Sequence, residues 1–285
     1  MEAKKIWDRP NPMPPGREFE VYHPVDDDVQ AIIYHNHPFY EIYFYIQGHN
    51  RIIVEGLDLL PSRGDVLIYP PGIMHRNIHQ DAQVPYERFY VFARREFLQS
   101  ISAADFDIPA TIAQMTRGGQ YYFHVNEQQL DELVTIADMM IESAKHTKPA
   151  EKLLNRYRMG ILLVDALTMM TSREIMPQSE YSKGMSRLIQ YINLHVTEPL
   201  TLDDLADAFF ASKYYLLREF KRYTGISVHQ YMIIRRIMLA QELIGQGVKP
   251  RDACARCGFT DYSSFYRSFK ARTGLSPEQF RSQNS

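Results

Sequence analysis

The chain has 285 residues, of which 45% are hydrophobic and 23% charged, a composition that is ordinary for a globular protein. No run approaches the roughly 18 apolar residues of a membrane span, and the first sixteen residues lack the apolar core of a signal peptide. Two cysteines are too few for a disulfide framework. We therefore expect a soluble, reduced, cytoplasmic protein of about two domains.

The net charge of −2 is unevenly distributed along the chain. Residues 1–180 carry 17 basic and 25 acidic side chains, whereas residues 181–285 carry 15 basic and 9 acidic ones. The C-terminal third is thus positive in a slightly acidic protein. This indicates a module that binds a polyanion, although a solvated basic face would have the same charge.

The first twenty residues are rich in proline and charge and are predicted to form an extended arm. Short runs rich in Ile, Val, Tyr and Phe follow from Ile32 to Ala93, separated by glycines, a pattern typical of an antiparallel sandwich or barrel. From Val125, apolar residues recur at helical spacing, with a break at Pro149 between two helices. The predicted regions are an arm (1–20), a barrel (21–124), a helical coupling or dimerisation segment (125–176), a polar linker (177–184) and an all-helical domain (185–285).

Cys254 and Cys257 have the spacing of redox and zinc motifs. There is no second cysteine pair, and no histidine follows closely. We interpret both cysteines as small residues on a helix.

Two segments near the C-terminus repeat each other at an offset of 49 residues. SKYYLLREFKRYTGISVHQY (212–231) and DYSSFYRSFKARTGLSPEQF (261–280) share seven of twenty residues. Each copy begins with a residue suited to cap a helix, Ser212 or Asp261, and contains a glycine suited to end one. A shorter predicted helix precedes each copy. This is the plan of a helix-turn-helix, whose second helix enters the major groove of DNA.

The second helix of each motif has a polar face that suits contact with DNA. Arg218 and Arg267 occupy matched positions and can each hold a guanine through two hydrogen bonds. Lys221 and Lys270 follow one turn later, where they suit phosphates. For any single residue, a solvated face is the alternative. The predicted DNA-binding residues are Lys213, Tyr214, Leu217, Arg218 and Lys221 in the first motif and Tyr262, Ser263, Ser264, Arg267 and Lys270 in the second.

The last hundred or so residues resemble the DNA-binding domain of the AraC/XylS family of bacterial transcription regulators. The resemblance rests on GFTDYSSFYRSFKARTGLSPEQFR (258–281) and on a long helix near 228–245 between the motifs. The alanine-rich RDACARCGF departs from the family, which has larger aliphatic residues there. We further expect double-stranded DNA and RNA polymerase as partners, a homodimer, and a bias towards activation. The resemblance implies base contacts by Tyr214, Leu217 and Arg218 in the first motif and by Ser263, Ser264 and Arg267 in the second.

A second group of residues indicates a site in the predicted barrel. His35, His37 and Glu41 have even spacing and so share one face of a strand, and His75 follows a PPG turn. The stretches that contain them, HNHPFYEIYFYIQG and GDVLIYPPGIMH, resemble the two cupin motifs, H-x-H-x3-E-x6-G and G-x5-P-x-G-x2-H. In regulators of this family, cupin-like domains sense sugars and related metabolites. The resemblance implies that this chain senses a ligand of the same kind.

Three interpretations of this site are open. In the first, which we favour, the site binds a small-molecule effector, requires no cofactor and has no enzymatic activity. In the second, it holds a divalent metal such as zinc, iron or nickel, and the protein is a metal-dependent cupin enzyme with a DNA-binding tail. In the third, these are ordinary polar residues of a barrel. The predicted effector residues are His35, His37, Glu41, Tyr43, His75 and Tyr90, and the predicted metal ligands are His35, His37, Glu41 and His75.

The expected fold is therefore α+β and multidomain. An N-terminal cupin-like β-barrel with a helical hairpin precedes an all-α domain with two helix-turn-helix motifs. The expected function is that of a sequence-specific DNA-binding transcription regulator, an activator controlled by a sugar or related metabolite. The effector would act by binding two arrangements of the protein with different affinities.

Overall fold

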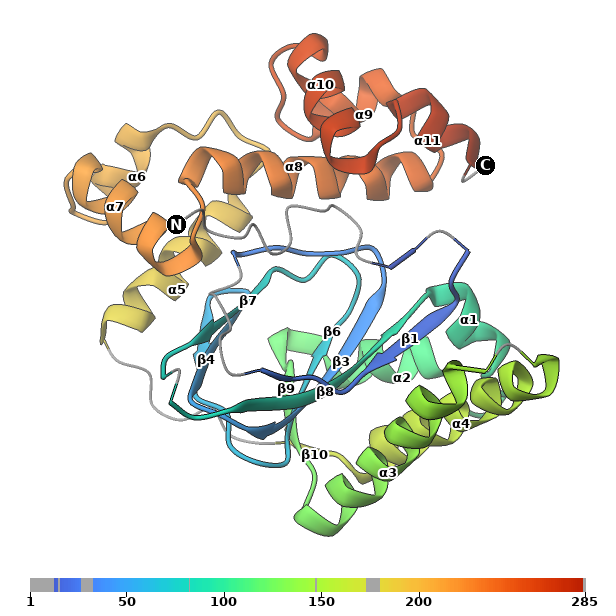
Figure 1. Ribbon diagram of the computed structural model, residues 1–285. Helices are drawn as coiled ribbons and strands as arrows, with labels where there is room; N and C mark the ends of the chain where they lie inside the picture. Colours follow the sequence, from blue (N-terminus) through green and yellow to red (C-terminus); the bar gives the residue numbers. More distant parts are fainter. Residues whose placement is uncertain are drawn as a thin grey trace, which may run out of the picture. The chain divides into compact units, whose positions relative to one another are not determined.

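The computed structural model describes residues 13–14, 16–26, 33–81, 83–146, 148–172 and 180–283. The chain divides into two compact units, Met1–Gln178 and Ser179–Ser285. The first combines strands and helices, whereas the described part of the second is helical (Figure 1). This is the α+β, multidomain class that the sequence predicts. None of the helices in the described ranges is long and apolar enough to cross a membrane.

The N-terminal unit contains two antiparallel sheets. The strands of the larger sheet are β1 (Phe19–Tyr22), β2 (Val25–Asp26), β3 (Tyr40–Gln47), β6 (Asp65–Tyr69), β8 (Tyr86–Ala93), β9 (Tyr122–His124) and β10 (Thr171–Ser172). Their order is β1-β8-β3-β6-β9-β10, and β2 also pairs with β8. The strands of the smaller sheet are β4 (Asn50–Val54), β5 (Leu57–Leu59) and β7 (His75–His79), with β4 in the centre. Backbone hydrogen bonds between His35 and His75 tie the segment before β3 to the smaller sheet.

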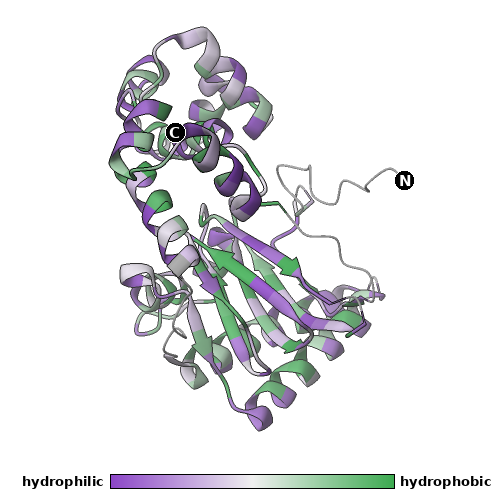
Figure 2. Cartoon of the chain, turned by 90° about the vertical axis from the view of Figure 1, so that its left-hand side faces the viewer, coloured by the Kyte–Doolittle hydropathy of each residue, from purple (hydrophilic) through white to green (hydrophobic). Residues whose placement is uncertain are grey.

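Strand β3 shows how alternation divides the core of this unit. All of its residues except the last are buried. Ile42 and Phe44 belong to the cluster shared with the helices, whereas Tyr43 and Tyr45 belong to the cluster shared with the smaller sheet. A strand that is covered on both faces reads as a continuous apolar run. Figure 2 shows such apolar stretches along the strands of this unit.

Helices cover the larger sheet on the face away from the smaller one (Figure 1). Their main part is a hairpin whose apolar side chains join those of β3 in one core. Asn126 and Gln129 form a capping box at the start of the first hairpin helix, and Pro149 begins the second, as the sequence predicts. The helices are α1 (Arg95–Ser100), α2 (Ile108–Met115), the 3-10 helix η1 (Arg117–Gly119), α3 (Glu127–Ala144) and α4 (Pro149–Met169).

The C-terminal unit contains both helix-turn-helix motifs. Ser212 and Asp261 cap the recognition helices, and Gly225 and Gly274 end them in the left-handed conformation, with φ of 83° and 76°. Each of these four predicted caps is confirmed. The described helices are α5 (Glu180–Leu194), α6 (Leu202–Ala208), α7 (Lys213–Thr224), α8 (Val228–Gly245), α9 (Pro250–Arg256), α10 (Tyr262–Thr273) and α11 (Pro277–Gln283). The recognition helices are α7 and α10, and α8 is the predicted long helix between the motifs.

The structure departs from two predicted boundaries. Residues 19–20, assigned to the arm, lie in β1 because they pair with β8. Residues 180–184, assigned to the linker, form the start of α5, since Ser182 and Met185 already lie on its buried face. The remaining linker residues, 177–179, and most of the arm lie outside the described residues.

The two cysteines lie in the core of the second motif. Cys254 is 5% exposed and Cys257 fully buried, and both pack with Phe265 and Phe269. Burial raises the pKa of the Cys257 thiol to about 12. Redox and metal chemistry need the thiolate, which such an environment disfavours. The two cysteines were predicted to be small residues on a helix: Cys254 lies on α9, and Cys257 is the residue that caps its end.

Candidate functional site

A cavity of about 80 Å³ lies between the two sheets of the N-terminal unit, and β3, β6, β7 and β8 all contribute to its walls. All six residues predicted to bind an effector line it. Five others were not predicted, although three of them, Tyr86, Arg88 and Phe92, alternate with the predicted Tyr90 along β8 and so share one face of that strand. The lining residues are His35, His37, Glu41, Tyr43, Tyr69, His75, Asn77, Tyr86, Arg88, Tyr90 and Phe92.

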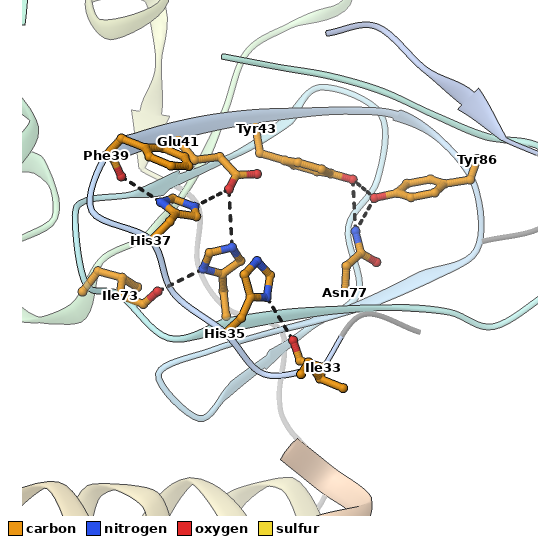
Figure 3. Close-up of polar contacts among 10 residues, drawn as sticks. Ile33, His35, His37, Phe39, Glu41, Tyr43, Ile73, Asn77 and Tyr86 are labelled. Carbon is orange, nitrogen blue, oxygen red and sulfur yellow. Dashed lines mark hydrogen bonds and ion pairs between the residues drawn. The ribbon is translucent and has the colours of Figure 1, made fainter. Parts of the chain in front are cut away.

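At one end of the cavity a buried carboxylate faces two imidazoles (Figure 3). Oε2 of Glu41 lies 2.7 Å from Nε2 of His37 and 3.4 Å from Nε2 of His75. The three side chains bring one ligand atom each within 4.8 Å of one another. Of the four predicted metal ligands, His35 is outside this group, although its ring centroid lies 4.3 Å from that of His75.

Hydrogen bonds on the far side of each ring orient these imidazoles. Nδ1 of His37 lies 2.9 Å from the carbonyl oxygen of Phe39, and Nδ1 of His75 lies 3.0 Å from that of Ile73. A carbonyl oxygen only accepts, so each Nδ1 carries the proton. These bonds direct Nε2 of each ring at Glu41, as in the outer-shell support of a metal ligand.

The charge of this end is set by burial and by mutual contacts. Burial lowers the pKa of His37, and burial with the neighbouring His75 and His37 lowers that of His35 to about 3. Burial alone would raise the pKa of Glu41, but hydrogen bonds with His37 and His75 outweigh it and lower that pKa. An ionised carboxylate can bond to these two Nε2 atoms only through a proton on each nitrogen or through a cation between them. Two imidazoles, one carboxylate and an open side form a donor set that suits zinc, iron or nickel.

The opposite end of the cavity carries hydroxyl and amide groups (Figure 3). The hydroxyls of Tyr43 and Tyr86 contact each other, and the Asn77 amide donates to both. Burial raises the pKa of both phenols, which keeps them neutral. The Arg88 guanidinium lies 4.1 Å above the Tyr86 ring and pairs with Asp26. This end therefore offers a ligand hydrogen bonds from neutral hydroxyl and amide groups, and the charge of Arg88 is balanced by Asp26.

The described part of the arm reaches the wall of this cavity. Met13 is fully buried in a cluster with Phe39 and Phe92, and Phe92 lines the cavity. Nε of Arg94 donates to the Arg17 carbonyl at 2.8 Å and holds the arm beside β8.

The residues predicted to contact DNA lie mostly on exposed surfaces of the recognition helices. Tyr214 is 74% exposed and lies beside Arg218, whereas Tyr262 is half-buried, packs against Phe265 and donates its hydroxyl to Glu278 at 2.5 Å. Tyr262 thus belongs largely to the core of its motif. The exposed residues are Lys213, Tyr214, Leu217, Arg218, Lys221, Ser263, Arg267 and Lys270, and Ser264 is half-buried.

Comparison with known proteins identifies both units. Residues 20–157 match the AraC-like ligand-binding domain, and residues 205–283 match a helix-turn-helix domain that covers both motifs. The chain belongs to the AraC family of transcription regulators. The first match contains the cavity and the second contains both recognition helices, so this AraC-family protein is an effector-controlled regulator that binds DNA.

Several relatives of this AraC-family protein are regulators by name. It is 27% identical to YbfI, an uncharacterized HTH-type transcriptional regulator of Bacillus subtilis, over 80% of this chain and 79% of that one. It is 28% identical to the HTH-type transcriptional activator RhaR of Escherichia coli over 53% of each chain, about half of that relative's length. Among solved structures, it is similar to the C-terminal domain of AraT, a response regulator from Geobacillus stearothermophilus. That similarity is 31% identity over 37% of this chain and 88% of that one, with a TM-score of 0.35.

Proposed function

We propose that the cavity of this regulator binds a neutral, polyhydroxylated metabolite, a sugar or a close relative of one. The observation that carries the proposal is the cavity itself, with hydrogen-bonding groups at both ends and aromatic walls between them. Arg88 is balanced by Asp26, and Glu41 is engaged by two histidines. The cavity therefore favours a ligand with many hydroxyls over one with a net charge.

The effector would control transcription by a shift between two arrangements of the chain. Met13 packs against Phe92 of the cavity wall, which supports a part for the arm in sensing the ligand. We propose activation as the outcome, with RNA polymerase as the partner, because RhaR is named as an activator. Because the proposed partner is DNA, we also propose that the protein acts in the cytoplasm. We propose that the protein is a regulator without enzymatic activity.

Base reading is proposed for residues of the two recognition helices that are exposed or, in the case of Ser264, half-buried. Tyr214, Leu217 and Arg218 would read one major-groove segment, and Ser263, Ser264 and Arg267 the next. Lys213, Lys221 and Lys270 would contact phosphates. Tyr262 has the least support, since its hydroxyl is engaged by Glu278.

A homodimer is proposed through the outer face of α4. Leu153, Leu154, Tyr157 and Ile161 are 46–64% exposed. Tyr157 follows the two leucines by three and four residues, and Ile161 follows Tyr157 by four, so the side chains form one apolar stripe on the helix. The opposite face, with Met159 and others, is buried in the core. A stripe of this kind on a helix that is already packed on its other side suits the same helix of a second copy.

A divalent cation in the cavity is the second candidate. It is favoured by one observation, the Nε2 atoms of His37 and His75 that face a single oxygen of Glu41. When bound, the cation would polarise a ligand oxygen. His37, Glu41 and His75 would hold it, and the Nδ1 hydrogen bonds of the two histidines would fix their rings.

Thermal unfolding of the full chain tests both candidates. We expect a neutral monosaccharide to raise the unfolding temperature, since a ligand at a hundred times its Kd stabilises a protein by about 2.7 kcal/mol. The corresponding sugar acids and sugar phosphates should have little effect. If zinc, iron or nickel alone stabilises the chain and EDTA reverses this, while no sugar does so without metal, the second candidate is correct.

A further inference from the structure

The two matched arginines of the recognition helices have different partners. Nε of Arg218 lies 2.9 Å from Oε1 of Glu219. Arg267 forms no ion pair with a carboxylate among the described residues, although its charge, after the hydrogen bonds from Ser264, helps to lower the pKa of Asp261. Its Nη2 donates to the Ser264 hydroxyl at 3.3 Å. In Arg218 the bond uses the inner nitrogen, so both terminal nitrogens stay available. In Arg267 the bond uses one of the two N–H groups of a terminal nitrogen, on the side of the guanidinium that a two-bond grip on guanine uses.

Glu219 is itself held in place. Its side chain is only 6% exposed, whereas that of Arg218 is 57% exposed. Its second oxygen lies 2.6 Å from Nη2 of Arg222, whose guanidinium lies 4.7 Å above the ring of Tyr181 in the first turn of α5. The hydrogen bond from Arg218 lowers the pKa of Glu219 and keeps the carboxylate ionised. A buried carboxylate that accepts a hydrogen bond from Arg218 and forms an ion pair with Arg222 can hold the exposed Arg218 guanidinium in one orientation.

The repeat shows that this arrangement belongs to the first motif alone. At the offset of 49 residues, Ser268 stands where the first motif has Glu219, and Ala271 stands where it has Arg222. Neither a serine nor an alanine side chain can engage a guanidinium as a carboxylate does. The two arginines therefore occupy matched sequence positions, but only the Arg218 side chain is held by a neighbouring carboxylate.

We propose that Glu219 is a positioning residue for DNA reading, which fixes Arg218 through Nε and leaves both terminal nitrogens for a base. This rests on the proposed role of Arg218 as a base-reading residue. An arginine that is already oriented loses less side-chain freedom on binding, so more of its hydrogen-bond energy appears as discrimination. Discrimination by the first motif then depends on Glu219, whereas Arg267 in the second motif works without such a restraint.

The carboxylate does not oppose DNA binding as an exposed acid would. Arg218 and Arg222 together outweigh its charge, and both guanidinium groups lie nearer the solvent than the carboxylate does. Approaching DNA would therefore contact the two guanidinium groups before the more deeply buried Glu219 carboxylate.

The test uses the full chain and a duplex selected by the wild type from a random-sequence library. Binding is measured with all four bases at each position, for R218A, E219S, E219Q and the double variant R218A/E219S. E219S introduces the serine of the matched position, and E219Q keeps one acceptor for Nε. We expect R218A and E219S to lose discrimination at the same position by about fivefold or more, as one bidentate contact supplies. E219Q should lose less, positions read by the second motif should not change, and the double variant should match R218A.

Other results would overturn the proposal in distinguishable ways. If R218A loses discrimination and E219S does not, Arg218 reads a base without help from Glu219. If R218A loses none, both the base-reading role of Arg218 and the positioning role of Glu219 are wrong. If E219S weakens all sequences and all positions alike, or adds fully to R218A, Glu219 acts on folding and not on Arg218. Urea unfolding of each variant and the milder E219Q keep a loss of stability separate from a loss of reading.

Discussion

The side chains that line the cavity differ in what their hydrogen bonds leave available. His37 and His75 donate from Nδ1 to backbone oxygens and so direct Nε2 at Glu41. Tyr43 and Tyr86 stay protonated because burial raises their pKa. Each end of the cavity therefore presents defined donors and acceptors, which is how a small pocket distinguishes one polar ligand from another.

His37→Ala tests the pocket at this scale. The substitution removes a side chain that reaches Glu41 and packs flat against Phe39, with ring centroids 4.0 Å apart. We expect stabilisation by the sugar found in the thermal screen to disappear, while DNA affinity without effector stays within about twofold. His49→Ala is the matched control, since His49 is exposed and lies outside the cavity lining. A normal effector response in the His37 variant would exclude this residue from the site.

Arg267→Ala tests base reading by the second motif. We expect specific binding to weaken by about 1–3 kcal/mol and one base position to become permissive. Competition binding against duplexes altered at single positions measures both effects. An equal loss on random DNA would show that Arg267 contributes charge and no base recognition.

Lys270→Ala should behave differently from the arginine substitution. Lys270 is exposed one turn further along α10, where it suits a phosphate. We expect affinity to fall alike on all sequences and the slope of log affinity against log salt to decrease by about one. Titrations at four salt concentrations measure this, and an unchanged slope would remove Lys270 from the phosphate contacts.

At the scale of elements, glycine has two distinct uses in the helix-turn-helix motifs. Gly274 ends α10 with φ of 76°. The space around it is open, and an added Cβ would have no neighbouring atom within 4 Å. Gly258 has φ of 82° after α9, and an added Cβ would lie 2.6 Å from the carbonyl oxygen of Thr197. Arg236 of α8 donates to the carbonyl of Val196 in the same loop at 2.7 Å. This loop thus packs closely against both α8 and the turn after α9.

Gly258→Ala and Gly274→Ala form a matched pair that separates backbone strain from crowding. Both put an L-residue in the left-handed region, which costs about 1–2 kcal/mol. Gly258→Ala should cost about 1–3 kcal/mol more, because the neighbouring backbone must move. Urea unfolding measures the difference. Equal losses would mean that the loop around Thr197 relaxes freely.

At the scale of the whole molecule, the stripe on α4 determines the expected assembly. The double substitution Tyr157→Asp with Ile161→Asp places two charges on the proposed interface, and we expect the dimer to dissociate into monomers. Sedimentation velocity of the full chain measures this. Leu194→Asp, on an apolar residue of α5 that is even more exposed, is the control and should leave the assembly unchanged. A dimer that persists in the double variant would move the interface elsewhere.

Much of the architecture could be predicted because it is encoded between neighbours in the chain. The caps at Ser212 and Asp261 and the glycines that end α7 and α10 act within a few residues. The histidines and Glu41 could be assigned to one site from their motif spacing. The prediction that His35, His37 and Glu41 share one face of a strand is wrong, because β3 begins only at Tyr40 and both histidines precede it. The start of α5 was missed because polar residues 180–184 look like a linker until their packing is known.

The sequence by itself determined two DNA-binding motifs, a sheet-rich domain before them, and a site containing His37, Glu41 and His75. Only the tertiary structure brought Asn77 and Tyr86 to the far end of that site, and only it buried Glu219 behind Arg218. The physical reason is the range of the interactions. Periodicity and capping depend on residues a few positions apart, whereas the partners of a buried polar group come from whichever strands and helices pack around it.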